Sequence, residues 1–229
     1  MDPLHKQWND HHKALRRALA NQADFPAALE LFLSQHAAVH SAAISPDGPP
    51  SFEDEVWTGL NEAAFRAIPG DQEHSIAWCF WHLARIEDAT MSRLVAGEAQ
   101  LFHLEPWPQR LGVPFVETGN AMTPAEIAAL SAGLDMPALR AYRLAVGQRT
   151  RHIVAQIRPA DLKKKIDPSR LEQVLADGAV VEATRSMLEY WGSLSLAGLL
   201  LMPPTRHQII HLNEALRLKR LCKNLWTAQ

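Results

Sequence analysis

Three observations predict an all-α protein. Apolar residues recur at helical spacing along most of the chain, as Ile76, Phe80 and Leu83 do in one long segment. No segment alternates apolar and polar residues as a half-buried strand would. Proline, glycine and capping residues stand where helices would begin and end. We therefore predict a four-helix bundle with additional short helices, its four principal helices lying at about residues 26–42, 72–96, 136–157 and either 181–201 or 205–222.

In the N-terminal part, the first helix is expected at residues 3–20, which are amphipathic. The second begins after Asp24-Phe25-Pro26, because proline suits the first turn of a helix. The run Ser45-Pro-Asp-Gly-Pro-Pro50 has the composition of a turn. Ser51 then caps a short helix whose first turn is acidic.

In the middle of the chain, the long helix at 72–96 is expected to stop at Gly97. Residues 98–122 contain several prolines and glycines and are predicted to form a long loop. A loop of this length in a compact domain has a task, such as lining a pocket or reaching a partner subunit. Thr123-Pro-Ala-Glu126 combines a cap, a first-turn proline and an acidic third residue, so a helix starts there.

Near the C-terminus, Asp167-Pro168 starts a short helix. Residues 181–201 read as a very apolar helix, which Pro203-Pro204 is expected to break, and a last helix follows from about residue 205 to 222. The 229 residues suit a single domain, with residues 1–25 as an N-terminal extension helix and residues 26–222 as the bundle core.

Composition excludes several classes of partner. A formal net charge of −2 gives no basic face for nucleic acid. Two cysteines are too few for a disulfide framework, and the N-terminus does not read as a signal peptide. The longest apolar stretch, residues 194–202, is too short to cross a bilayer. We expect a cytoplasmic protein without a membrane partner.

Histidines are the residues that carry chemistry in this sequence. His207 and His211 are one helical turn apart, so their side chains share a face and suit one ion. This spacing alone is weak, because eleven histidines give about half of one such pair by chance. Arg206, Asn213 and Glu214 flank this pair and offer outer partners for the ring nitrogens that do not bind metal. His82 lies on a helix crowded with aromatic residues, where an imidazole needs a hydrogen-bond partner or a metal.

His36 and His40 form a second pair at the same spacing. They complete the first site from another helix, or stand as polar groups at its mouth. The simpler expectation is that one is exposed and the other hydrogen bonded. Glu87 and Asp88 are too close to His82 in helix phase to face it, so they are expected to cap, to pair with Arg85 or to face solvent.

The remaining histidines and the tryptophans suggest less. His74 is expected near a pocket rim at most. The histidines without a pairing pattern are expected at the surface; these are His5, His11, His12, His103 and His152. Most tryptophans in helical segments are expected to fill core, namely Trp57, Trp78, Trp81 and Trp191. Trp107, in the long loop, is the one placed to cover a ligand.

Two segments of the chain resemble one known family. The run Ser75–Asp88, with His-Leu-Ala-Arg-Ile-Glu from His82, and the run Thr205–Glu214 resemble the DinB/YfiT-like superfamily of metalloenzymes. The resemblance implies a four-helix bundle in which His82, His207 and His211 hold one divalent metal ion: zinc, nickel or iron. It also implies a low-molecular-weight thiol, such as bacillithiol or mycothiol, as cosubstrate, and a homodimer.

The resulting hypothesis is a divalent-metal-dependent enzyme, a thiol-dependent S-transferase or a hydrolase, acting on a small molecule. Glu214, His36 and His40 are the candidates for a general base. The alternative is a non-catalytic helical protein that binds a partner or a small ligand and whose histidines are structural.

Overall fold

The computed structural model describes residues 3–45 and 51–226, and most of the turn predicted at residues 45–50 lies outside them. Within the described residues every regular element is a helix, and the only strand-like pairing is one isolated bridge between Lys165 and Ser195. The all-α prediction is confirmed. None of these helices combines the length and the apolar character needed to cross a membrane.

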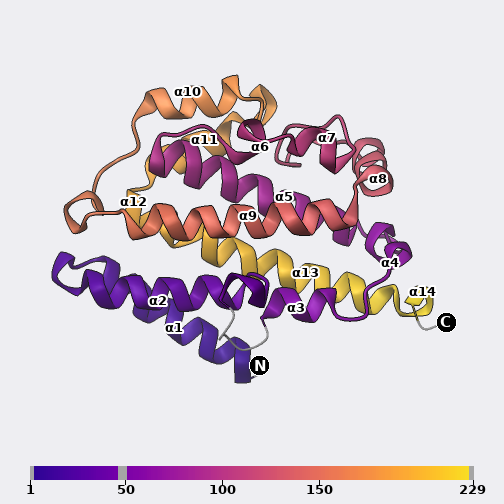
Figure 1. Cartoon of the computed structure of the whole chain (residues 1–229), viewed down its shortest axis with the longest axis horizontal. Coiled ribbons are helices and arrows are strands. Elements are labelled where there is room, and N and C mark those ends of the chain that lie inside the picture. Colours follow the sequence, from indigo (N-terminus) through magenta and orange to yellow (C-terminus); the bar gives the residue numbers. More distant parts are fainter. Residues whose placement is uncertain (1–2, 46–50, 227–229) are drawn as a thin grey trace.

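Four helices form the bundle and run side by side across Figure 1. They are α2 (Phe25–Ala38), α5 (Ile76–Asp88), α9 (Met136–Ala155) and α13 (His207–Leu221). Helix α5 packs against both α9 and α13, and α2 packs against α9. The fourth bundle helix, which the sequence left open between two segments, is therefore α13. Helix α1 (Pro3–Leu19) packs on the outside of α2.

Shorter helices surround the bundle. The α-helices among them are α3 (Phe52–Trp57), α4 (Glu62–Arg66), α6 (Leu101–Leu104), α7 (Trp107–Leu111), α8 (Pro124–Gly133), α10 (Pro168–Ala176), α11 (Arg185–Ser193), α12 (Leu196–Leu200) and α14 (Lys223–Trp226). The 3-10 turns are η1 (Gln22–Asp24), η2 (Ala42–Ile44), η4 (Pro159–Asp161) and η5 (Glu182–Thr184). Two π-helical segments, η3 (Ala89–Ala96) and η6 (Met202–Arg206), directly adjoin α5 and α13.

Predicted helix starts are confirmed where a side chain caps them. Ser51 and Thr123 each form a capping box, with Asp54 and Glu126 respectively. Helix α5 starts at Ile76 rather than at residue 72, because the hydroxyl of Ser75 accepts the backbone N–H of Trp78 and so replaces a missing helical partner.

The predicted break at Pro203-Pro204 is wrong. Helix α11 ends at Ser193, and the chain then stays helical from α12 through η6 into α13. Pro204 lacks the N–H that an α-helix would direct to the carbonyl of Leu200, and the hydroxyl of Thr205 donates to that oxygen instead, at 3.0 Å. This side-chain donor and the wider π-helical turn carry the helix through both prolines.

The long loop predicted at residues 98–122 also differs, because it contains α6 and α7. Its later part lies along α5, where the carbonyl of Val116 accepts from Arg85 and that of Glu117 accepts from the indole of Trp81. Trp107 does not cover a ligand. It is buried in the core, with the Arg110 guanidinium 3.9 Å from its ring centroid. Trp57, Trp78, Trp81 and Trp191 are buried, as expected.

Candidate metal centre

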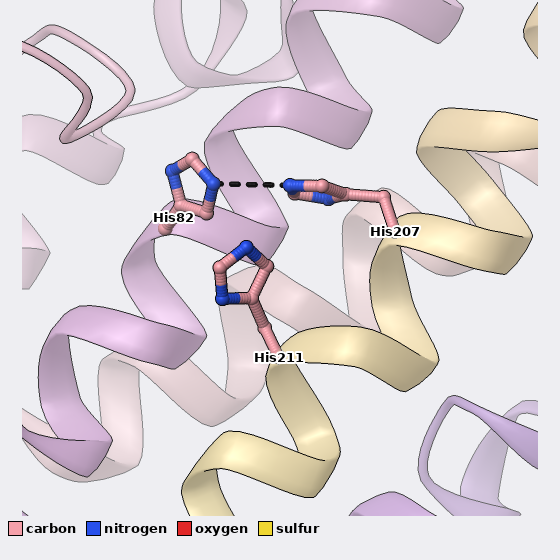
Figure 2. A group of neighbouring side chains, drawn as sticks. All are labelled: His82, His207 and His211. Carbon is pink, nitrogen blue, oxygen red and sulfur yellow. Dashed lines mark hydrogen bonds between the residues drawn. The ribbon is translucent and has the colours of Figure 1, made fainter.

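Three imidazoles converge at the contact between α5 and α13. His82 projects from the middle of α5, and His207 and His211 lie one turn apart at the start of α13 (Figure 2). Their ring centroids form a nearly equilateral triangle with sides of 4.8, 4.7 and 4.7 Å. The Nε2 atoms of His82 and His207 are 3.0 Å apart. The predicted convergence of these histidines is therefore present in the fold.

Hydrogen bonds to neighbouring residues fix the tautomers of two of these rings. Nδ1 of His82 lies 2.7 Å from the carbonyl oxygen of Thr118, and Nδ1 of His211 lies 2.8 Å from Oε2 of Glu214. A carbonyl and a carboxylate only accept hydrogen bonds, so both Nδ1 atoms donate. In the neutral rings Nε2 then carries the lone pair, which is the form that binds a metal.

Burial keeps His82 and His207 in the neutral form. Burial, with a smaller contribution from nearby His211, lowers the pKa of His82 to about 3. Burial also lowers the pKa of His207 well below its usual value, and the other two imidazoles add to the effect. Both rings are therefore available as ligands at neutral pH without first losing a proton.

Glu214 links the centre to a fourth histidine. One carboxylate oxygen accepts from His211 and the other from Nδ1 of His74, at 2.8 Å each. Burial alone would raise the pKa of Glu214, but the hydrogen bonds from His211 and His74 outweigh it and lower the pKa to about 2. Both oxygens of this ionised group are occupied, so it is placed to orient His211 rather than to act as a general base.

These residues fit a divalent cation. Three imidazole nitrogens with positions left open form the donor set of a three-histidine zinc site. Metal–nitrogen bonds of about 2.0–2.1 Å in a tetrahedral site imply roughly 3.3 Å between neighbouring ligand atoms. The 3.0 Å between the Nε2 atoms of His82 and His207 is close to that separation, and the ligating atoms of all three histidines lie within 4.8 Å of one another.

The centre forms part of the wall of a cavity of about 820 Å³. This volume is typical of sites for small organic molecules. Trp78 shapes the wall, because its ring stacks on His82 at 4.7 Å and on His74 at 3.5 Å. Gly119 lets the loop before α8 approach closely: its φ is +99°, and a Cβ there would lie 2.8 Å from the indole nitrogen of Trp78. The loop lines a pocket, as its length predicted.

His36 and His40 do not join this centre. Both are buried, and their Nε2 atoms lie 2.9 Å from the two carboxylate oxygens of Glu87. The expectation of one exposed and one hydrogen-bonded histidine is therefore wrong, as is the expectation that Glu87 caps, pairs with Arg85 or faces solvent. Helix phase excluded contact between Glu87 and His82, but it said nothing about the end of α2, from which His36 and His40 reach Glu87.

Other sequence expectations can be placed as well. Asp88 pairs with Arg85 at 3.6 Å and accepts backbone N–H groups at the start of α6, as predicted. His74 lines the cavity, in line with the expected place near its rim. His12 was expected at the surface, but it is 6% exposed and stacks on Trp8, because α1 buries this face against α2.

Comparison with known proteins agrees with this geometry. A family model described as the DinB superfamily matches residues 54–215. The match spans well over half of the chain, so the chain belongs to the DinB superfamily. The matched range includes all of the three-histidine centre, whereas His36 and His40 precede it. No curated protein matches the chain.

Proposed function

We propose that this member of the DinB superfamily is a metal-dependent enzyme that acts on a small molecule. His82, His207 and His211 are the proposed ligands of one divalent cation: zinc, nickel or iron. The observation that carries the proposal is the triangle of imidazoles on the wall of a cavity of about 820 Å³. A purely structural set of histidines would not need a cavity beside it.

In the proposed reaction, a group of the substrate is transferred to a thiol, or the substrate is hydrolysed by water, inside this cavity. A divalent cation there would act as a Lewis acid and lower the pKa of a thiol or a water molecule. The chain itself holds the rings: Thr118 and Glu214 fix two tautomers, and the indole of Trp78 supports the His82 ring.

The cavity wall supports a small organic substrate together with a low-molecular-weight thiol. Its apolar part includes thioether and aromatic side chains, which adapt to ligand shape; these are Met122, Met187, Met202, Trp78, Tyr190 and Trp191. Gln72 and Asn120 add neutral polar groups that can hold a ligand in one orientation.

Metal content and turnover test this function. Protein purified without a histidine tag should lose one equivalent of metal on His207→Ala combined with His211→Ala, and again on His82→Ala alone. The exposed His152→Ala variant is the matched control and should keep its metal. If His82→Ala and His207→Ala each leave bound metal unchanged, the proposal fails.

A substrate screen follows from the same variants. Thermal shifts are measured against a panel of thiols that includes bacillithiol and mycothiol, followed by a conjugation assay with an electrophilic acceptor. Turnover that disappears with His207→Ala supports the enzyme. Binding of thiols without any turnover would instead favour a non-catalytic ligand-binding protein.

A further inference from the structure

A second group of metal-binding side chains lies apart from the cavity. His36, in the last turn of α2, and His40, just beyond it, face Glu87 of α5. Their relative exposures are 0%, 1% and 0%, so the group is sealed from solvent. The two imidazole centroids are 4.1 Å apart. None of the three side chains lines the cavity of the three-histidine centre.

The donor atoms of this group form a closed set. Nε2 of His36 lies 2.9 Å from Oε1 of Glu87, and Nε2 of His40 lies 2.9 Å from Oε2. A carboxylate that binds through both oxygens would thus give, with the two rings, four nitrogen and oxygen donors around one point. A set of four donors that leaves no position open distinguishes a structural zinc site from a catalytic one, and imidazole with carboxylate suits zinc.

The charge of the group favours a cation. Within the described part of the chain, the hydrogen bonds to the Glu87 carboxylate come from two imidazoles and the carboxamide of Gln208. The two buried guanidinium groups nearby are engaged elsewhere: Arg85 pairs with Asp88, and Arg143 pairs with Glu53. A fully buried carboxylate without a compensating cation is costly.

Two cations can balance this carboxylate, a proton on one ring or a metal ion. A proton is held by one ring at a time, whereas a metal ion at the point between the donors would meet both rings and both carboxylate oxygens at once.

The surrounding residues hold these donors in place. Gln208 donates to Oε2 of Glu87 at 3.0 Å and accepts from Arg143 at 2.9 Å, so the carboxylate has a fixed orientation. Gly147, in the middle of α9, leaves room for the His40 ring, because a Cβ there would lie 2.8 Å from Nδ1 of His40. A glycine inside a long helix costs about 1 kcal/mol of stability relative to alanine. At this position the missing side chain makes space for the His40 ring.

We propose that His36, His40 and Glu87 form a second, buried site for a divalent cation of the zinc class, which stabilises the fold and takes no part in the reaction. The ion would tie the end of α2 to α5, and it would enter while the chain folds, because the finished site has no opening to solvent. This site does not depend on the proposed function.

The test removes two ligands of the open centre, the one formed by His82, His207 and His211, and measures how much zinc the protein still binds. His207 and His211 border the cavity, so truncating both to alanine opens space into the cavity rather than burying a void. Untagged protein is freed of metal with a chelator under mild denaturation, refolded with Zn²⁺ and measured by elemental analysis. We expect two equivalents of zinc in the wild type, one in His207→Ala/His211→Ala, and none when Glu87→Gln is added.

A second measurement uses the wild-type protein, so that the proposal can be tested even if the Glu87→Gln variant does not fold. In the wild type, a colorimetric chelator should release zinc in two phases, a fast one from the open centre and a slow one from the buried site. A single fast equivalent that disappears in His207→Ala/His211→Ala overturns the proposal and leaves a proton as the cation. One equivalent in the wild type that persists in the double variant supports the buried site and contradicts the proposed function instead.

Discussion

His82, His207 and His211 face a cavity, whereas His36 and His40 are sealed in with a carboxylate, although both groups contact the same helix, α5. The open group, His82 with His207 and His211, offers three imidazole nitrogens, and outer hydrogen bonds fix the tautomers of two of these rings. The closed group offers two nitrogens and two oxygens that face one another. The two groups therefore differ in their access to solvent and in the charge of their ligands. They do not differ in the spacing of their histidine pairs, because both pairs are four residues apart.

The comparison shows what a histidine pair at helical spacing predicts. Spacing places two rings on one face of a helix, but the opposing helix determines what they meet. His207 and His211 meet His82 beside a cavity. His36 and His40 meet Glu87 in a closed interior. The open group suits exchange of substrate and water, and the closed group suits a permanent partner.

The largest expected difference between the groups is in stability. Glu87→Leu leaves both imidazoles and the Gln208 amide without their buried acceptor, so we expect a loss of about 3–5 kcal/mol in the free energy of unfolding. His207→Ala should cost much less, because its side chain borders the cavity. Urea unfolding measures both. Equal losses in the two variants would mean that the groups do not differ in this way.

Gly147→Ala should also act on the closed group alone. The added methyl would lie 2.6 Å from Ile44 Cδ1 and 2.8 Å from His40 Nδ1, so we expect a loss of about 1–3 kcal/mol despite the better helix propensity of alanine. Gly192→Ala is the matched control, since its methyl would meet the movable tip of Leu171. Thermal or urea unfolding compares them. A Gly147→Ala protein as stable as the control would show that His40 has room to move.

Much of the fold was predictable from local signals. Helix starts at Ser51 and Thr123 follow from side chains that bond within the next three residues, and such bonds can be read from sequence. The continuation through Pro203 and Pro204 could not be read in this way. It depends on a π-helical turn and on the Thr205 hydroxyl replacing a backbone donor.

The candidate sites show the same limit. His82 could be assigned to the group with His207 and His211 because short family-like motifs surround these residues. Glu87 could not be assigned, because its partners lie 51 and 47 residues away, at the end of α2 and just beyond it, and the sequence does not specify how this segment packs. A buried glutamate among apolar neighbours was the available signal, since a buried carboxylate requires a partner.

A smaller effect should distinguish the two groups through their outer hydrogen bonds. Glu214→Gln weakens the hold on His211, so metal affinity at the open centre should fall about tenfold to a hundredfold. The closed group has no contact with Glu214 among the bonds of the described residues, so its slow zinc release should not change. Glu73→Gln, in the same cavity wall, is the control. Competition with a chelator of known affinity measures both centres. An unchanged affinity in Glu214→Gln would mean that this carboxylate does not orient a ligand.

The smallest expected effect tests whether a histidine outside the two histidine groups makes the stability of the fold sensitive to acid. His12 is buried outside both of them, near Arg206, Arg16 and Gln35, and burial with the two arginines lowers its pKa to about 4. The folded state then binds fewer protons than the unfolded state, whose histidine pKa is 6.5, so the stability due to His12 is complete above 6.5 and is lost as the pH falls towards 4. Between pH 7 and pH 5.5, wild-type protein should therefore lose about 1 kcal/mol more than His12→Gln. Urea unfolding across this range measures the difference, with the exposed His152→Gln as control. A parallel loss of stability in His12→Gln and the wild type would contradict the assignment of this acid sensitivity to His12.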